Sequence, residues 1–308
     1  MSASHHADAL PPGRVEEVAD QVFAYVQPDG SWWVNNAGFV VGADGLVGVD
    51  ACSTVARTQA LREAVVATAG RPPRTRVNTH HHGDHTHGNA LFPEATVVAH
   101  HRTRHEVLAT GFLGNIGIWE DVDWGDVQVR APSLTYADGI TLWVDDRSID
   151  VRHVGRPAHT TNDSYVWLPE QGVLFAGDLL FSGGTPFVLM GSVRGAVEAL
   201  QEVVAPLAPR IVVPGHGPVR GPDVVDEVLA YLAFVEDTAR AGIAAGVTPL
   251  ECARSTDLGG FAELSDPERL AGNLHRAYAD QTGGEVDLLA ALSDMVALNG
   301  GRPLRCRA

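Results

Sequence analysis

The chain has 308 residues, of which 45% are hydrophobic and 19% are charged, a composition typical of a globular protein with a large core. Its net charge of −16 argues against nucleic acid or an anionic membrane as the main partner, because both attract basic surfaces. The sequence contains no apolar run long enough to span a bilayer and no secretory signal in its first residues, so we expect a cytoplasmic protein.

The first half of the chain predicts alternating strands and helices after a disordered tail over residues 1–14. Alternating and β-branched residues predict strands over 21–27, 33–41 and 45–50. Helical spacing that ends at a glycine predicts a helix over 54–69. We then expect a strand over 75–79, a helix over 86–92, a strand over 96–99, a helix over 100–110 and an irregular segment over 111–138.

The second half changes from strands to helices near Pro222. We expect strands over 140–144, 148–154, 164–168 and 172–176, then a helix over 192–206 and a strand over 211–214. Beyond Pro222 the apolar spacing is helical, with breaks near residues 248–251, 257–260 and 282–285. These patterns predict an α/β domain over residues 15–221 and a helical C-terminal extension over 222–308.

The stretch NTHHHGDHTHGN crowds five histidines and one aspartate into twelve positions. His80 and His82 are two residues apart after a predicted strand, so extended backbone places both on the face opposite to His81. The glycine that follows allows a turn that aims Asp84 and His85 at a second point nearby. The alternative is a histidine-rich turn on the protein surface.

Three further polar residues follow predicted strands. His159 lies in a loop rich in glycine and proline, Asp178 comes just after an apolar strand, and His216 lies in a tight glycine-rich turn. Each alone has a structural explanation, as a loop residue, a helix cap or a turn residue. Together they predict a metal site, because strand ends can meet at one edge of a sheet. Imidazoles and carboxylates without a thiolate suit zinc, with iron or manganese as alternatives.

Four segments, HHHGDH, GRPAHTTND, FAGDLLF and VPGHGP, resemble the motif series of the metallo-β-lactamase superfamily. The resemblance covers roughly residues 15–220 and implies a catalytic domain there, with an α/β fold of the four-layered αββα type. It also implies two zinc ions at one edge of the sandwich and a catalytic Asp84 that orients a hydroxide and moves its proton. The implied ligands are His80, His82 and His159 for the first ion, Asp84, His85 and His216 for the second, and Asp178 for both.

The residue types favour some branches of this superfamily over others. Secreted β-lactamases carry Cys or Ser where this chain has Asp178, and the nucleases need a basic surface, so thioesterases and lactonases fit better. Hydroxyacylglutathione hydrolases share all seven ligands but typically use lysine and arginine to hold glutathione, and this chain has no lysine. Persulfide dioxygenases, with a single iron, and a non-catalytic binding protein with a vestigial fold remain alternatives.

A narrower resemblance concerns the opening segment VFAYVQPDGSWWVNNAGFVVG and the later segment GNLHRAY. With the histidine-rich stretch, they are similar to the zinc-dependent cyclase/thioesterases of bacterial aromatic (type II) polyketide biosynthesis. This resemblance implies a thioesterase or cyclase whose small-molecule substrate is a poly-β-ketone tethered to an acyl carrier protein. The C-terminal segment would bring Arg276 or Tyr278 to the substrate as a lid, and Arg71, Arg74, Arg102 and Arg104 could bind an acidic carrier protein.

Aromatic residues could line the pocket of such an enzyme, although the protein core is their commoner location. We expect Trp32 and Trp33 on a hairpin at the mouth, with at most one of them in the core, because neighbours in extended backbone point to opposite faces. The flanking loops would add Trp119, Trp124, Phe181 and Phe187. The other histidines have structural roles in this interpretation, namely His87 beside the ligands, His100, His101 and His105 on a helix, and His153 in a strand.

Overall fold

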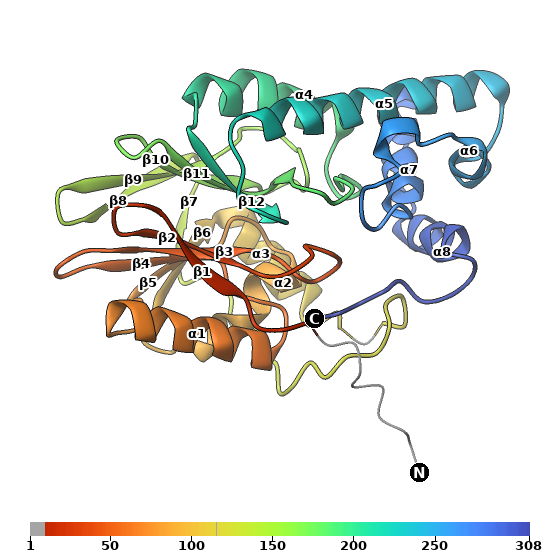
Figure 1. The fold of residues 1–308 in the computed structure, drawn as a ribbon. Helices are drawn as coiled ribbons and strands as arrows, with labels where there is room; N and C mark the ends of the chain where they lie inside the picture. Colours follow the sequence, from red (N-terminus) through yellow and green to blue (C-terminus); the bar gives the residue numbers. More distant parts are fainter. Residues whose placement is uncertain (1–9, 115) are drawn as a thin grey trace, which may run out of the picture.

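Two β-sheets packed face to face form the centre of the protein (Figure 1). The computed structural model describes residues 10–114 and 116–308, so most of the predicted tail over 1–14 lies outside the described residues. The first sheet contains, in spatial order, β1 (Arg14–Ala19), β2 (Val22–Val26), β3 (Ala37–Val41), β4 (Leu46–Val49), β5 (Thr75–Val77), β6 (Thr96–His100) and β7 (Leu134–Tyr136). The second contains β12 (Ile211–His216), β11 (Val173–Phe181), β10 (Ser164–Leu168), β9 (Arg147–His153) and β8 (Gly139–Val144).

Parallel pairing brings several strand ends to one edge of the sandwich. In the first sheet β1 to β4 pair antiparallel, whereas β4, β5, β6 and β7 run parallel. In the second sheet β11 and β12 run parallel, and the remaining pairs are antiparallel. Because parallel strands end at the same edge, the residues that follow β4 and β5 and those late in β11 and β12 can converge there.

Helices cover the outer faces of both sheets and complete the predicted αββα sandwich (Figure 1). The helix α1 (Val55–Ala69) packs on the first sheet, and α4 (Val193–Ala199) and α5 (Asp223–Ala245) pack on the second. The strand β11 shows why four layers form, since it is buried on both faces. Its residues Val173 and Phe175 pack between the sheets, whereas Leu174 and Ala176 belong to the core beneath the helices.

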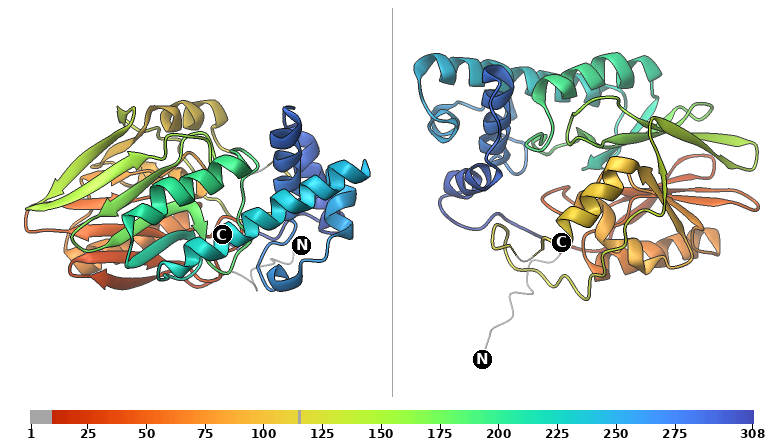
Figure 2. Two further views of the ribbon diagram at one scale, coloured as in Figure 1. Left: turned by 90° about the horizontal axis from the view of Figure 1, so that it is seen from above. Right: turned by 180° about the vertical axis from the view of Figure 1, so that it is seen from behind.

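The C-terminal extension is helical, as predicted, and stands beside the sandwich (Figure 2). It contains α5, which also packs on the second sheet, then α6 (Pro249–Ser255), α7 (Arg269–Thr282) and α8 (Leu288–Leu298). Thr248 and Glu251 form a capping box that starts α6, and Gly283, with φ +71°, ends α7. One hydrophobic cluster joins these helices to α4 and to the second sheet. No helix among the described residues has the length and hydropathy needed to cross a membrane.

Several local predictions differ from the structure. The strands β1 and β7 were not predicted, and β7 lies in the segment expected to be irregular. The strand expected from residue 33 begins only at Ala37, because Trp33 has φ +66° and forms a turn. The helix expected over 86–92 is instead the short α2 (Gly83–Thr86) followed by a 3₁₀ turn, and the helix expected over 192–206 ends its α-helical part at Ala199 and continues as π and 3₁₀ turns.

Candidate metal centre

The first sheet and the turn after β5 supply four of the seven candidate ligands. The chain leaves β5 at Val77 and turns through His80 and His82 into α2, so this stretch is not extended as predicted. The turn is fixed by Thr79, whose backbone N and Oγ1 both donate to the Asp50 carboxylate at 2.8 Å. The helix α2 then carries Asp84 and His85, the other two ligands from this part of the chain.

The second sheet supplies the other three. His159 follows β9, and His216 is the last residue of β12. Asp178 was predicted just after a strand but lies inside β11, because the strand continues to Phe181 beyond an irregularity in its pairing with β12. Gly177 adopts φ +52° at that irregularity, a conformation that favours glycine, and so directs the next side chain toward the other ligands.

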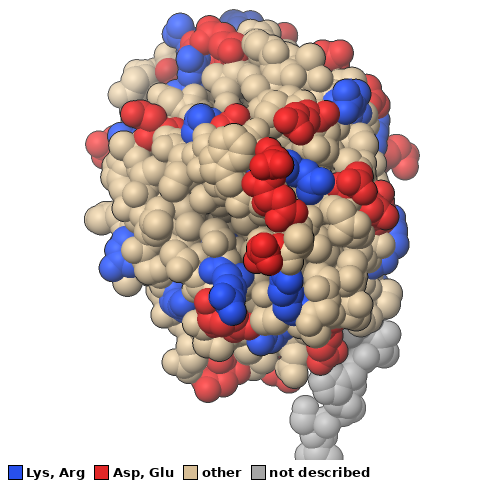
Figure 3. All heavy atoms as spheres, turned by 90° about the vertical axis from the view of Figure 1, so that its left-hand side faces the viewer, with Lys and Arg blue, Asp and Glu red and all other residues tan. Residues whose placement is uncertain are grey.

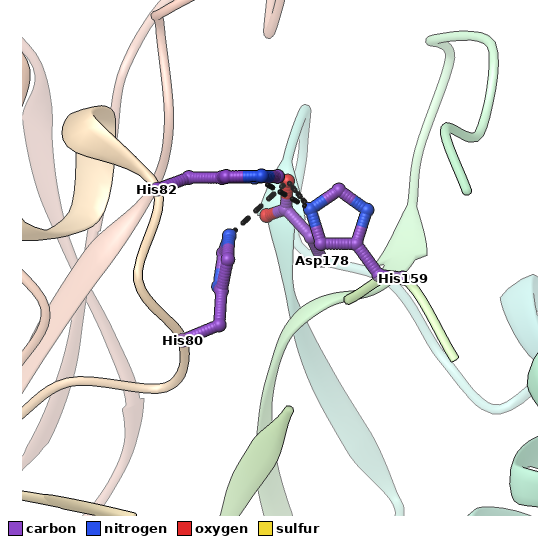
Figure 4. Close-up of side chains that lie close together, drawn as sticks. All are labelled: His80, His82, His159 and Asp178. Atoms are coloured by element: carbon purple, nitrogen blue, oxygen red, sulfur yellow. Dashed lines mark hydrogen bonds and ion pairs between the residues drawn. The ribbon is translucent and has the colours of Figure 1, made fainter. Parts of the chain in front are cut away.

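Four of these side chains form a first group (Figure 4). One ligand atom from each of His80, His82, His159 and Asp178 lies within 4.8 Å of the others. His82 Nδ1 is 2.8 Å from His159 Nε2, and Asp178 Oδ2 is 3.4 Å from the same His159 nitrogen. His80 Nε2 lies 4.0 Å from Asp178 Oδ2. Three imidazole nitrogens and a carboxylate oxygen therefore point at one small volume.

The remaining three ligands, Asp84, His85 and His216, form a second group with atoms within 4.8 Å. His216 Nε2 lies 3.2 Å from Asp84 Oδ2, and His85 Nε2 lies 3.7 Å from it. Asp178 also faces this group, with Oδ1 3.0 Å from His85 Nε2 and Oδ2 3.3 Å from His216 Nε2. The structure therefore brings all seven predicted residues together, with Asp178 between the two groups.

Each of the five histidines points one ring nitrogen into the centre and binds a fixed partner with the other. Such partners set the ring orientation and the tautomer of a metal-binding histidine. The pairs are His80 Nδ1 with Thr79 Oγ1 at 3.1 Å, His82 Nε2 with Met190 Sδ at 3.4 Å, His85 Nδ1 with Asp50 Oδ2 at 2.8 Å, His159 Nδ1 with the Phe187 carbonyl, and His216 Nδ1 with the Gly30 carbonyl at 3.2 Å.

Asp50 is the functional residue that sequence reasoning missed. It is buried, directly follows β4, and accepts hydrogen bonds from Thr79 and from the His85 ring. The signal that would have found it is the one used for the ligands, a polar residue at the end of an apolar strand. Asp50 therefore belongs to the centre without facing the ligand cavity.

The charges of the buried groups favour a cation. Burial lowers the pKa of His80 and His82 well below the usual histidine value, so both rings are neutral. Burial alone would raise the pKa of Asp178, but His216, His85 and the other histidines hold it well below its usual range. Burial opposes protonation of His216, yet the two carboxylates raise its pKa to about 9. Protons on the histidine rings thus balance the negative charge of the two carboxylates. A metal ion that binds at these positions would displace these protons.

A second observation supports a metal centre at these residues. The buried atom His80 Nε2 has no hydrogen-bond partner, and His85 Nε2 and Asp178 Oδ1 face only each other, 3.0 Å apart and without the geometry of a hydrogen bond, although buried polar atoms are usually paired. All three point into the two groups. Imidazole nitrogens and carboxylate oxygens at this density are the ligands that zinc and similar divalent ions take in proteins.

A cavity opens beside the two groups, and five of the seven candidate ligands line it. The rest of its lining is mainly apolar and comes from the turn after β2, the loops after α3 (His101–Thr110) and β11, and α8. The apolar lining residues are Trp32, Trp33, Leu113, Ile116, Trp119, Phe181, Phe187, Leu189, Met190, Leu288 and Leu292. A ligand at the metal centre would therefore lie against aromatic and aliphatic walls.

Trp32 and Trp33 are both buried, with 8% and 7% exposure, which corrects the expectation that at most one lies in the core. They do not alternate, because the left-handed backbone at Trp33 breaks the extended geometry. Both rings contact Trp119, at centroid distances of 5.7 and 5.1 Å. The expected Trp124 packs on Trp33 at 4.9 Å and does not line the cavity.

The proposed lid residues do not line the cavity either. Arg276 pairs with Asp280 at 2.9 Å, and the Tyr278 hydroxyl donates to the Val247 carbonyl at 3.2 Å. The extension instead lines the cavity with Arg269, which lies over the Trp32 ring at 4.1 Å, and with two leucines of α8.

The remaining histidines divide between the cavity and the fold. His81 binds Asn162 at 3.0 Å and His87 stacks on Trp33, and both also line the cavity. Burial lowers the pKa of each to about 4. His100 is buried and stacks on His153 at 4.0 Å, outside both ligand groups.

The four arginines suggested for carrier binding do not form one patch. Arg71 and Arg74 lie before the start of β5, whereas Arg102 and Arg104 follow the end of the parallel strand β6, so the two pairs lie at opposite ends of these strands. On the side of the molecule away from the C-terminal helices, acidic and basic side chains lie intermixed (Figure 3).

A sequence model of the metallo-β-lactamase superfamily matches residues 30–216, more than half of the chain, and includes all seven candidate ligands. The chain belongs to the metallo-β-lactamase superfamily. Among curated relatives, hydroxyacylglutathione hydrolase from Rhodospirillum rubrum is 29% identical over 140 residues, 46% of each chain. The enzyme of that name from a Synechococcus species is 29% identical over 137 residues, 41% of this chain and 44% of its own. The matches thus span less than half of these relatives.

Solved structures of the superfamily share the fold. A metallo-β-lactamase from Pontibacter korlensis superposes with a TM-score of 0.61 at 19% identity, over 72% of this chain and 99% of its own. The metallo-β-lactamase FIM-1 from Pseudomonas aeruginosa, in its mono-zinc form, superposes with a TM-score of 0.60 at 19% identity, over 73% of this chain and 96% of its own. At such identity the likeness establishes the sandwich architecture and not the substrate.

Proposed function

We propose that this protein is a metal-dependent hydrolase of thioester or ester bonds whose acyl group is flat and apolar. The observation that carries the proposal is the cavity, in which five candidate metal ligands share one space with three tryptophans and two phenylalanines. An apolar acyl chain held by these walls would have its carbonyl end at the metal centre.

The seven ligands would hold two zinc ions, which lower the pKa of a bound water and polarise a carbonyl oxygen. Asp84 lines the cavity, and its pKa lies well below the usual range; burial opposes this, but His85 and His216 outweigh it. Its ionised carboxylate can accept a hydrogen bond from a water molecule and so orient it toward the substrate.

The ionisable side chains of the cavity that are not candidate ligands favour a thioester as the substrate, because none of them readily protonates a leaving group. Apart from the candidate ligands, the ionisable side chains among the described lining residues are His81, His87 and Arg269. Both histidines are neutral at pH 7, since burial lowers their pKa to about 4, and an arginine does not give up its proton readily. A thiolate, whose thiol has a pKa of roughly 8.5, leaves without protonation by such an acid.

The finer proposal is a cyclase/thioesterase of aromatic polyketide biosynthesis. The aromatic walls supply the apolar surface needed to hold a poly-β-ketone in a folded shape. Arg102 and Arg104 are exposed on α3 (His101–Thr110), whose C-terminal residue lines the cavity, so this helix is the surface we propose for an acidic carrier protein.

A second candidate is a thioesterase that acts on glutathione conjugates, as the names of the curated relatives suggest for those proteins. The identity of 29% over 140 residues supports this candidate. The lack of lysine and the apolar cavity walls weigh against it, because glutathione is a charged peptide.

Turnover of four substrates by the zinc-loaded protein separates these functions. The set is an aryl thioester, an acylated homoserine lactone, S-lactoylglutathione and a β-lactam. We expect the aryl thioester to be fastest and the β-lactam slowest. Faster turnover of S-lactoylglutathione would favour the second candidate, and no turnover of any thioester or ester would overturn the proposal.

A further inference from the structure

A buried asparagine in the C-terminal extension clamps the segment that follows β11. Asn273 in α7 is fully buried, and its Nδ2 donates to the Pro186 carbonyl at 2.8 Å. Its Oδ1 accepts from the Val188 backbone N at 2.9 Å. A further bond from Nδ2 to the Tyr231 hydroxyl, at 3.2 Å, fixes the orientation of the amide. The two backbone bonds flank Phe187 on both sides and so hold its peptide groups in place.

Other residues of α7 hold the same segment at its two ends. Arg269 Nη1 donates to the Thr185 carbonyl at 2.8 Å. Asp280 Oδ2 accepts from Ser192 Oγ at 3.0 Å. The segment from residue 185 to 192 is therefore bonded to α7 along its length, with Asn273 near its middle.

The clamped segment also contacts two candidate metal ligands. The Phe187 carbonyl accepts a hydrogen bond from His159 Nδ1, and Met190 Sδ lies 3.4 Å from His82 Nε2. These are the ring nitrogens that point away from the centre. A proton held on the outward nitrogen leaves the lone pair of the inward nitrogen free for a cation.

The second ligand group has different support. His85 is oriented by Asp50, which follows β4, and His216 by the Gly30 carbonyl, which follows β2. Neither contact involves the segment after β11 or α7. The contacts that orient the His82 and His159 rings thus come from a different part of the chain than those that orient the His85 and His216 rings.

We propose that Asn273 is a positioning residue for the first metal group and acts through Phe187 and Met190 on His159 and His82. The inference rests on the metal centre of the proposed function. In this inference the C-terminal extension supports metal binding at the first group, although all ligands of that group lie in the αββα sandwich. Loss of the asparagine amide should free the segment, and the partners of the outward nitrogens should be lost with it.

Zinc titration of the metal-depleted full chain against a competing chelator tests this proposal. Long-range ¹H–¹⁵N spectra of the histidine rings report His159 and His216 separately. We expect Asn273→Ala to weaken zinc binding at the first group about tenfold or more, the range seen when partners of ligands are removed, and to leave the second group unchanged. The matched control is Gln281→Ala, which removes another α7 amide that bonds to main chain, at Glu236, and should change neither group.

The outcomes separate the inference from the proposed function. A wild-type protein that binds no metal would overturn both. Two bound metals with equal weakening of both groups in Asn273→Ala, or with no weakening, would overturn the inference alone. If Asn273→Ala does not fold, Met190→Leu decides, because it conserves volume and removes the sulfur beside His82. Unchanged zinc binding at the first group in Met190→Leu would then overturn the inference.

Discussion

Asp178 is the residue on which the candidate centre depends most. Its two carboxylate oxygens lie within 4.0 Å of ring nitrogens from His80, His85, His159 and His216, which belong to both ligand groups. His81 directly follows His80 in sequence and lines the same cavity as Asp178, yet it belongs to neither group. Asp178 and His81 line one cavity, but only Asp178 is expected to bind metal.

Asp178→Ala should lower kcat/KM for a thioester by at least about 100-fold. Removal of a mere hydrogen-bond partner of a metal ligand already lowers metal affinity or activity by about 10- to 100-fold. His81→Ala should have a much smaller effect, because that ring binds Asn162 rather than a ligand. Both variants are compared with wild type in activity and zinc content. Similar losses in the two variants, with zinc retained in both, would contradict the assignment.

Asp50→Asn should weaken zinc binding at the second group roughly 10- to 100-fold, because His85 loses a charged hydrogen-bond acceptor. Zinc titration of the metal-depleted protein measures the change. The control is Asp163→Asn, a buried aspartate that accepts from the backbone N and Oγ1 of Thr160 as Asp50 does from Thr79, and that touches no candidate ligand. Equal weakening in both variants would show a general effect of losing a buried carboxylate.

Among the elements, the turn after β2 has the clearest link to substrate choice. The left-handed residue Trp33 lets two adjacent tryptophans face the same cavity. Trp32 is held by its indole N–H, which donates to Glu268 at 2.7 Å, and by Arg269 over its ring. The wall of the cavity is thus fixed by residues of the C-terminal extension.

Replacement of Trp32 or Trp33 by Ala should impair cyclisation of a long polyketide thioester more than hydrolysis of a small one. Only the long substrate needs the walls, and an aromatic contact contributes about 0.5–1.5 kcal/mol, so the ratio of the two rates should fall by up to roughly tenfold. Product analysis for both substrates gives this ratio. Trp143→Ala, on the exposed face of β8, is the control. An unchanged ratio in both cavity variants would contradict the polyketide cyclase proposal and support only the more general metal-dependent hydrolase.

The sequence predicted the sandwich through the resemblance of its motifs to the superfamily, and it predicted which seven side chains converge at one edge of the sheets. Apolar strands followed by polar residues identified His159, Asp178 and His216, and the sheet edge gathers them as expected. The turn at Trp33 was not predictable in this way, because tryptophan gives no sign of a left-handed backbone conformation, whereas the irregularity in β11 falls at Gly177, a residue type that does mark such sites. The role of Asn273 could not be predicted for a further reason, since its two backbone partners are 85 and 87 residues away.

At the scale of the whole molecule, the C-terminal helices and the sandwich share one core. The largest hydrophobic cluster includes Leu174 of β11 together with Leu232 of α5, Leu274 of α7 and Met295 of α8. The chain continues past α8 and returns to the loop after α3, where Leu304 pairs with Trp119, a residue that lines the cavity. The extension therefore contributes to the cavity from several directions.

Metal analysis of the purified protein tests the central claim most directly. Metal-depleted protein is titrated with zinc, desalted and analysed by mass spectrometry for zinc per chain, with thioester turnover followed in parallel. The seven ligands predict close to two zinc ions per chain, the number typical of a dinuclear centre, and activity that a chelator removes and zinc restores. A protein that retains no metal, or one that hydrolyses thioesters equally well without metal, would contradict the account.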